Sequence, residues 1–328
     1  MRGISVTKVS VIVPVYNMKN YIPRLLQSIE NQTYDRWELI LVDDHSDDGT
    51  YELLLDFRDK HPDKVEVLRT PKPRSSPMVG KNIGIEVSSG RYIAFIDSDD
   101  WWSETFLEDT VSKMDGVDGT CTEYYDVLER DGKKIHVKFS KKGEVSWEDV
   151  LKLKVRFGNG NSLLKRSIIE NYGILFPPEL WYSEDVYFYA QYLSVADRVY
   201  AVSKPHFYHL VREVSMVQGK GDDPEKKLKQ TLRVYKKVCE RIQKISIRSR
   251  DVCTLLEGYL RPYSIMSYIT AISDSYGREY ARETFWRYSR YVFSYKPTNS
   301  HLSKLTLLWV VDLFIPVRFL LRRLFSRE

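Results

Sequence analysis

Four consecutive polar residues, Asp97-Ser98-Asp99-Asp100, follow directly on the apolar run from Tyr92 to Ile96. Carboxylates gathered at the end of a strand repel one another unless a cation neutralises them. Such oxygen ligands favour Mn²⁺ or Mg²⁺, and Mg²⁺ is usually held by one or two carboxylates together with substrate phosphates. The run therefore predicts a divalent metal site that receives a diphosphate group, with a solvated turn as the alternative.

A second acidic group, Asp43-Asp44 and Asp47-Asp48, follows another apolar run, Leu39 to Val42. A carboxylate only accepts hydrogen bonds, which suits it to the N–H groups of a nucleotide base or to ribose hydroxyls. We assign this role to Asp44. Asp47 and Asp48 are equally suited to cap the helix that is predicted after them.

A third acidic pair, Glu184-Asp185, directly precedes a helical stretch rich in aromatic residues. A carboxylate within hydrogen-bond reach of a hydroxyl can remove its proton during a transfer reaction. Acidic residues at a helix N-terminus also stabilise the helix through its dipole. Both interpretations are open for this pair from the residues alone.

A further group of residues is a candidate for ligand contacts. Four aromatic side chains are suited to stack on sugar rings or to belong to the core: Trp101, Trp102, Trp181 and Tyr182.

The elements that must position these residues alternate between strands and helices over the first hundred residues. Apolar, β-branched runs predict strands, and apolar residues at helical spacing predict the helices between them. The predicted order is strand 9–15, helix 19–31, strand 39–42, helix 50–60, strand 65–68 and strand 92–96. This order indicates a mostly parallel sheet, which binds ligands beyond the carboxyl ends of its strands. The acidic runs can therefore converge on one crevice.

The later part of the chain predicts a mixed sheet followed by helices. Two strands are expected within residues 119–139, around Asp131-Gly132, a dipeptide favoured in type I′ turns, and another at Ser162–Lys165. Asp223-Pro224 has the residue types of an N-cap and first helical position, and a helical pattern runs to about Ile245. The face of this predicted helix that lies opposite its apolar residues is basic. A basic face is typical of a solvated helix surface, but also of a patch that binds anionic lipid or a phosphate-bearing acceptor.

Length and composition indicate an ordinary globular chain. Its 328 residues, 43% of them hydrophobic, are sufficient for one large domain and a smaller one. A net charge of +5 is too small over this length to indicate nucleic acid binding. The three cysteines are widely spread without C-x-x-C spacing, so neither a disulfide framework nor a zinc site is expected. Because residues 1–8 carry no apolar signal segment, we expect a cytoplasmic protein.

The last part of the sequence, Leu302 to Glu328, combines many apolar residues with arginines. Asp312 and Pro316 interrupt its apolar run, which argues against a membrane span. We predict an amphipathic helix that lies on the cytoplasmic face of the membrane, with packing on the domain or a dimer contact as alternatives. The sequence does not indicate the oligomeric state.

Four ordered motifs resemble those of the family 2 glycosyltransferases: Val9 to Asn17, Asp43 to Thr50, Lys81 to Ile85, and Ser89 to Asp100. Four motifs at family-like separations, within about residues 8–210, are more specific than a single D-x-D. The resemblance implies a GT-A fold, which is Rossmann-like α/β with a mixed, mostly parallel sheet flanked by helices. Together with the residue patterns after it, we predict a catalytic domain over residues 1–220, a helical region over 221–300 and the membrane-associating helix over 301–328.

The resemblance also implies residue roles. Tyr16 matches the aromatic residue that stacks on the base, Asp44 the acid that contacts the base, and Asp97 a residue near the ribose. Asp99 matches the metal ligand. In related enzymes a basic loop at the place of His209 and Arg212 closes over the diphosphate, which implies His209 or Arg212 as a contact of the metal or of a phosphate, although an isolated histidine is more often structural. The remaining candidates for donor binding are Pro14, Arg74, Lys81 and Ser98.

The segment from Asn161 to Asp185 resembles the acceptor side of the same family, in which the second acid of the pair is the catalytic base. This implies Asp185 as the base, with Glu184 in support. The sequence departs from the family at two positions, since His45 stands where glycine is common and Lys81 where arginine is usual. A lysine supplies positive charge without a bidentate fork, so Arg74 is a second cationic candidate.

The resemblance implies sugar transfer with inversion. Together with the residues of the site, it predicts a glycosyltransferase that uses a nucleotide-diphosphate sugar, with a UDP-sugar favoured, and Mn²⁺ or Mg²⁺. The predicted acceptor is a hydroxyl of a lipid-linked or cell-surface glycan. The alternatives are a nucleotidyltransferase, which would release pyrophosphate, and a non-catalytic nucleotide-sugar-binding membrane scaffold. A dinucleotide-dependent oxidoreductase is disfavoured, because no G-x-G-x-x-G follows the first strand.

Overall fold

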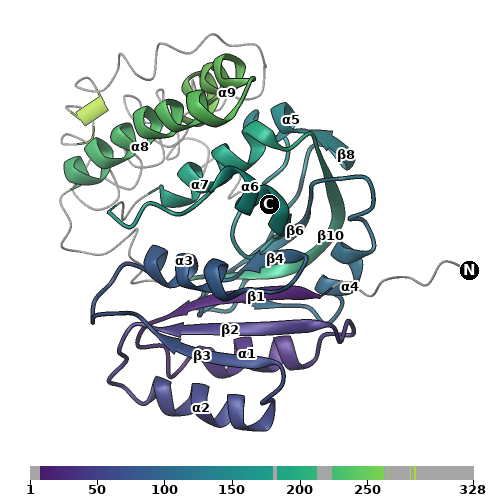
Figure 1. Cartoon of the computed structure of the whole chain (residues 1–328), viewed down its shortest axis with the longest axis vertical. Helices are drawn as coiled ribbons and strands as arrows, with labels where there is room; N and C mark the ends of the chain where they lie inside the picture. The colour runs from purple at the N-terminus through teal and green to yellow at the C-terminus, as the bar shows by residue number, and fades with distance from the viewer. Residues whose placement is uncertain are drawn as a thin grey trace, which may run out of the picture.

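The computed structural model describes residues 8–179, 183–212 and 224–261, together with residues 265, 281, 284 and 285. A single mixed sheet runs through the α/β part of the chain and is covered by helices on both faces (Figure 1). The predicted mixed, mostly parallel α/β architecture is therefore confirmed. The predicted N-cap Asp223, the aromatic residues Trp181 and Tyr182, and the segment 302–328 lie outside the described residues.

The first half of the sheet is parallel and has the order β3-β2-β1-β4. Its strands are β1 (Val9–Val15), β2 (Trp37–Asp43), β3 (Val65–Arg69) and β4 (Tyr92–Phe95). All seven residues of β1 are buried, because helices cover both faces of this central strand. The acidic runs lie at the carboxyl ends of β2 and β4, as the sequence predicted.

The second half continues through β9, β6, β10 and β5. Its strands are β5 (Trp101–Trp102), β6 (Gly119–Leu128), β7 (Lys134–Val137), β8 (Gly143–Ser146), β9 (Ser162–Lys165) and β10 (Arg198–Val211). β10 pairs in parallel with β6, and β9 joins β6 to β4 by antiparallel pairing. The long strand β10 thereby brings residues near 210 next to the end of β4.

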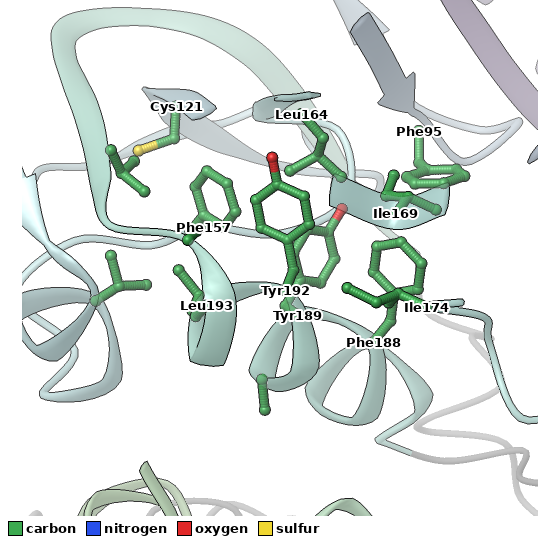
Figure 2. Packing of buried hydrophobic residues seen from close by; sticks show 14 of the residues in the cluster. Phe95, Cys121, Phe157, Leu164, Ile169, Ile174, Phe188, Tyr189, Tyr192 and Leu193 are labelled. Carbon is green, nitrogen blue, oxygen red and sulfur yellow. The ribbon is translucent and has the colours of Figure 1, made fainter. Parts of the chain in front are cut away.

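The helices form two layers that can be told apart by the hydrophobic cluster to which each contributes. The cluster that contains Val11 and Leu39 also takes side chains from α1 (Ile22–Glu30), α2 (Thr50–Lys60) and α4 (Phe106–Val111). The cluster on the opposite face takes side chains from α3 (Pro77–Val87), α5 (Trp147–Leu151), α6 (Arg166–Tyr172) and α7 (Glu184–Val195). Figure 2 shows Phe188 and Tyr192 of α7 packed toward Phe95 and Leu164 of the sheet in this second cluster.

The helical part beyond residue 223 begins with α8 (Pro224–Ile245) and continues with α9 (Ser249–Leu255) and the π-helical turn Leu256–Leu260. α8 ends at the predicted residue. Its side chains Tyr235, Val238 and Ile242 belong to the same cluster as those of α7, so α8 packs onto the α/β part of the chain. The division into domains at residues 220 and 300 stays a prediction.

Two glycines let α3 lie close against β1. A Cβ atom at Gly84 would stand 2.3 Å from Cγ2 of Ile12, and one at Gly80 would stand 3.2 Å from Cβ of Pro14. The first distance is shorter than any side chain tolerates, so the approach of α3 to β1 requires glycine at position 84. Pro14 is buried and lies beyond the last residue pair of β1 with β4, which joins Ile12 to Phe95. Because β4 does not extend as far as Pro14, the missing N–H of this proline costs no hydrogen bond to β4.

Two local expectations differ from the structure. α1 begins at Ile22 rather than near Lys19, because the chain first makes a turn in which the backbone N–H groups of Tyr21 and Ile22 both donate to the carbonyl of Met18. In the connection between β6 and β7, Gly132 has a positive φ of 67° but Asp131 does not. The type I′ expectation is therefore wrong, since that turn needs positive φ at both central residues.

Candidate active site

The pocket expected for the base begins with Tyr16 and Asp44 at the ends of β1 and β2. Tyr16 is 42% exposed, so its ring is open to a stacking partner. Oδ1 of Asp44 accepts hydrogen bonds from Oγ1 of Thr70 at 2.6 Å and from the backbone N–H of Ser75 at 3.0 Å. These bonds fix the carboxyl group, and its second oxygen is suited to accept from a ligand N–H.

The neighbouring acids Asp47 and Asp48 have structural partners. Asn17, in left-handed conformation at φ 51°, exchanges two hydrogen bonds with Asp47 at 2.8 and 3.0 Å. Asp48 accepts from the backbone N–H of Thr50, the first residue of α2, at 2.9 Å. Asp48 also accepts from the backbone N–H of Lys19, so both acids tie the loop after β1 to the loop after β2. The N-cap of α2 is Gly49, without a side-chain cap hydrogen bond, so neither Asp47 nor Asp48 caps this helix.

At the end of β4, Asp97 forms an ion pair with Lys81 of α3. The Nζ atom of Lys81 lies 3.1 Å from Oδ1 of Asp97, and the Lys81 side chain is only 2% exposed. Burial acts to lower the pKa of Lys81, but the charges of Asp97, Glu184 and Asp185 outweigh it and raise this pKa. Lys81 therefore remains an ammonium ion among three carboxyl groups.

Asp99 also has a cationic partner. Its Oδ2 accepts a hydrogen bond from Nη1 of Arg212 at 3.1 Å, and its backbone carbonyl accepts from Nη2 of Arg24 at 3.0 Å. Burial, reinforced by the nearby Asp97, raises the pKa of Asp99, while Arg212 opposes this effect. A carboxylate held in this way favours any ligand that brings additional positive charge.

Asp100, by contrast, points into the protein. It is buried and accepts a hydrogen bond at 2.7 Å from the backbone N–H of Leu210. Burial raises the pKa of Asp100 well above its usual range. Asp100 thus joins the end of β4 to β10, and Asp97 and Asp99 are the acids of this run that face the site. Ser98 lies buried between them.

His209 on β10 is oriented by Asp126 on β6. The two side chains are 2.9 Å apart between Nδ1 and Oδ1. Partial burial disfavours the imidazolium, yet the hydrogen bond to Asp126 and the charge of Asp100 raise the pKa of His209 to about 9. This contact also leaves Nε2 as the nitrogen directed away from Asp126, which is how a carboxylate orients a metal-binding histidine.

The acidic pair Glu184-Asp185 forms the first turn of α7. Burial and the adjacent Asp185 raise the pKa of Glu184 to about 7, against the opposing charge of Lys81. Asp185 is exposed at the surface, but the protein around its carboxyl group still desolvates it and raises its pKa. A carboxyl group of raised pKa is a stronger base once it is deprotonated.

Within the described part of the chain, no three His, Cys, Asp or Glu side chains gather into a ready-made metal cage. Asp99 nevertheless fits a site of another kind, because Mg²⁺ is commonly held by one or two carboxylates and completed by substrate phosphates. The desolvated carboxyl of Asp99 is the donor available for such a site. Nε2 of His209 would join it only after the imidazolium, whose pKa is raised to about 9, loses its proton to the incoming metal.

The structure brings most predicted residues to one edge of the sheet: Tyr16, Asp44, Lys81, Asp97, Asp99, Glu184, Asp185 and His209. Arg74 is exposed, with a positive φ of 56°. Nothing in the sequence indicated Arg24 or Asp126, and Asn82, although it lies in the motif Lys81 to Ile85, was given no role. Arg24 covers the ring of Trp101 at 3.5 Å while it binds Asp99, and its position in the sequence gives no signal of this.

The comparisons with known proteins identify the family of this chain. The sequence model of glycosyl transferase family 2 matches residues 10–173, and the chain belongs to this family. TuaG of Bacillus subtilis, named as a glycosyltransferase of teichuronic acid biosynthesis, is 33% identical over 147 residues, which cover 44% of this chain and 57% of TuaG. WfgD of Escherichia coli, a UDP-Glc:alpha-D-GlcNAc-diphosphoundecaprenol beta-1,3-glucosyltransferase, is 38% identical over 106 residues, or 32% of this chain and 40% of WfgD. The chain thus matches only part of the length of each of these relatives.

Solved structures support the same fold class. TarS of S. aureus (residues 1–349) in complex with UDP-GlcNAc superposes with a TM-score of 0.65 at 21% identity, over 84% of this chain and 88% of TarS. The mannosyltransferase PcManGT of Pyrobaculum calidifontis, in complex with GDP-Man and Mn²⁺, gives a TM-score of 0.54 at 17% identity, over 98% of this chain and 88% of that one. The predicted GT-A fold is confirmed, and the chain is a family 2 glycosyltransferase.

Proposed function

We propose that this glycosyltransferase moves a sugar from a UDP-sugar to a hydroxyl group of a lipid-linked or cell-surface glycan, with inversion at the anomeric carbon. The observation that supports this most directly is the environment of Lys81. Its buried ammonium contacts Asp97, which follows β4, and its charge acts on Glu184 and Asp185, which begin α7. The acids assigned to the donor and to the acceptor therefore face one site.

The donor is proposed to lie along the carboxyl ends of β1, β2 and β4. The base would stack on Tyr16 and donate an N–H to Asp44, and the ribose would lie near Asp97. UDP is favoured because TarS, which shares the fold, binds UDP-GlcNAc, and because WfgD, a sequence relative, uses UDP-Glc. The lipid-linked acceptor is proposed on the same basis, since WfgD acts on a diphosphoundecaprenol-linked sugar.

In the proposed reaction, the oxygen of the acceptor hydroxyl attacks the anomeric carbon, and Asp185 accepts the proton that this hydroxyl loses. The bond from that carbon to the diphosphate oxygen breaks, and UDP leaves with the bonding electrons. Attack from the face opposite the leaving group inverts the configuration. A general base in this position typically contributes about 10²–10⁴ in rate.

Mn²⁺ or Mg²⁺ would be held by Asp99, with His209 as the second candidate ligand, and would compensate the charge of the diphosphate. Arg212 lies beside Asp99 and is suited to neutralise the phosphates of the leaving group. PcManGT, which resembles this chain in fold alone, has a structure with GDP-Man and Mn²⁺ bound, and this supports the choice of metal.

We also propose that the protein works at an anionic membrane surface. The segment 302–328, for which an amphipathic helix is predicted, lies outside the described residues. Among the described helices, none has both the length and the apolar character to cross a bilayer. The outer face of α8 supports surface contact, because its basic side chains are exposed: Lys226, Lys229, Arg233, Lys236, Lys237 and Lys244.

A binding screen tests the donor assignment. Ligands that bind the native state raise its melting temperature by mass action. We expect UDP-sugars to raise Tm more than GDP- or CDP-sugars do, and to raise it more in Mn²⁺ than in EDTA. In a separate turnover assay, we expect the released product to be UDP. Release of pyrophosphate instead of UDP would contradict the proposal and indicate a nucleotidyltransferase.

A further inference from the structure

We infer that Lys81 and Asn82, neighbours on α3, are positioning residues that hold Asp97 and the acid-bearing end of α7 in one fixed arrangement. This inference rests on the proposed function, because it assumes that Asp185 acts on the acceptor. It assigns Lys81 to the alignment of protein acids rather than to direct contact with the donor.

Lys81 is oriented toward the protein. Its side chain is 2% exposed, its Nζ atom lies 3.1 Å from Asp97, and the ring centroid of Phe176 lies 5.3 Å from the same atom. An ammonium buried to this extent is stable only when carboxylates compensate its charge. Lys81 therefore fixes Asp97, the acid expected near the ribose.

Asn82 holds the chain segment that leads to the acid pair. Its Nδ2 donates to the backbone carbonyl of Phe176 at 2.8 Å, and its Oδ1 accepts from the backbone N–H of the same residue at 2.9 Å. A carboxamide can form such a two-way pair with a backbone residue, whereas a carboxylate or an apolar side chain cannot. Ser76, at the start of α3, adds a third bond, from its Oγ to the carbonyl of Pro178 at 3.0 Å.

The contact continues from Phe176 to α7. The rings of Phe176 and Phe188 are stacked, with centroids 4.1 Å apart and planes within 7° of each other. Phe188 lies one helical turn beyond Asp185, so the stack fixes the end of α7 that carries both acids. At its other side, α3 is fixed to β1 by the close approach at Gly84.

Electrostatics add a second link. The charged groups that face Lys81 are Asp97 from the loop after β4, and Glu184 and Asp185 from α7. The positive charge of Lys81 lowers the proton affinity of both acids of the pair, against burial, which raises it. Loss of this charge should make the pair bind protons more tightly and should move the acid limb of activity to higher pH.

The test compares Lys81→Met with Lys81→Arg in the full chain. The rate of UDP release is measured against pH, with a UDP-sugar that the wild type uses as a donor. We expect the acid limb of kcat for Lys81→Met to move up by about one pH unit. Lys81→Arg, which keeps the charge, should restore the wild-type limb. Lys165→Met is the matched control, because Lys165 forms an ion pair with Asp118 at 2.8 Å away from this cluster and should leave the pH profile unchanged.

Asn82→Asp tests the second contact. It keeps the acceptor for the N–H of Phe176 but loses the donor to its carbonyl, and we expect kcat to fall at least about tenfold while the Kd of UDP stays within about twofold. If Lys81→Met does not fold, Lys81→Gln carries the same expectation. An unchanged pH limb in the charge-removing variant, together with wild-type kcat in Asn82→Asp, would overturn the inference. A wild type that releases no UDP from any UDP-sugar would overturn the proposed function instead.

Discussion

Arg212 donates a hydrogen bond from Nη1 to Oδ2 of Asp99 at 3.1 Å, so the carboxylate assigned to the metal is paired with a cation of its own chain. Arg212 also lies over the ring of Tyr21, with its Cζ atom 4.9 Å from the centroid. A metal ion with its diphosphate would have to share Asp99 with this guanidinium. We therefore expect Arg212 to turn toward the phosphates when donor and metal bind.

The role of Asp99 leads to a prediction on metal dependence. Asp99→Asn keeps the shape of the side chain but removes the charge that a divalent ion requires. The wild type should bind UDP at least about tenfold more tightly in Mn²⁺ than in EDTA, and Asp99→Asn should bind UDP equally in both. Isothermal titration calorimetry measures both constants.

Asp118→Asn serves as the control for this measurement, since Asp118 pairs with Lys165 elsewhere in the sheet. It should retain the effect of Mn²⁺. If Asp99→Asn kept the same gain in affinity from Mn²⁺ as the wild type, another group would have to be the metal ligand.

The raised pKa of Glu184 predicts a dependence of stability on pH. Its folded pKa is about 7, above the value of 4.5 for an unperturbed glutamate, so folding favours the protonated form. The stability that this group contributes is present below about pH 4.5 and is lost as the pH rises through about 7. Glu184→Gln, which stays neutral, should therefore be more stable than the wild type at pH 8, by about 1–3 kcal/mol, and should differ little at pH 4.5.

Denaturant unfolding at the two pH values measures this difference. Glu52→Gln is the matched control, because Glu52 also occupies the first turn of a helix, in α2, but on the surface. It should show no gain at pH 8. Equal stability of Glu184→Gln and wild type at both pH values would contradict a raised pKa.

The close approach of α3 to β1 predicts the cost of a single methyl group. A Cβ atom at position 84 would meet Ile12 at 2.3 Å, so Gly84→Ala must displace the helix or the strand. We expect a loss of about 1–3 kcal/mol in the free energy of unfolding. Gly158→Ala is the control, because a Cβ atom there has no neighbour within 4 Å and φ is not positive. Equal stability of the two variants would show that α3 does not need this contact.

The basic face of α8 predicts binding to anionic vesicles. Reversal of Lys229, Arg233 and Lys236 to glutamate should weaken binding of the full chain to phosphatidylglycerol-containing vesicles by at least about 10²-fold, since each basic residue contributes about 1 kcal/mol near such a surface. Co-sedimentation at low and high salt measures the effect. The same reversal at Lys60, Lys113 and Lys133, exposed residues outside α8, is the control. Equal binding of the two triple variants would remove α8 from the membrane contact.

The strands and helices with regular apolar spacing could be predicted from the sequence. The strand Ser162–Lys165 and the helices Thr50–Lys60 and Pro224–Ile245 were predicted with the bounds that the structure has. α3 was not predicted, because Gly80 and Gly84 weaken its helical pattern. The same glycines allow α3 to pack closely against β1, so the residues that weaken the sequence signal of this helix are also the residues that position it.

The acids of the site were found because each follows an apolar strand or begins a helix. Of the residues that hold them, Lys81 and Arg212 were named, whereas Arg24, Asn82 and Asp126 were given no role, since they reach the site through pairings between distant segments. The parallel pairing of β10 with β6 places His209 beside Asp126, although 83 residues separate them. A single sequence carries no local signal for such a contact.

The most direct test of the central claim is the turnover of Asp185→Asn. This variant keeps the size and polarity of the side chain but cannot accept the proton of the acceptor hydroxyl. We expect kcat for sugar transfer to fall by about 10²–10⁴ while the Kd of UDP in Mn²⁺ stays at the wild-type value. Asp115→Asn, an exposed aspartate outside the site, should show wild-type kcat. Near-normal kcat in Asp185→Asn would contradict the assignment of the catalytic base.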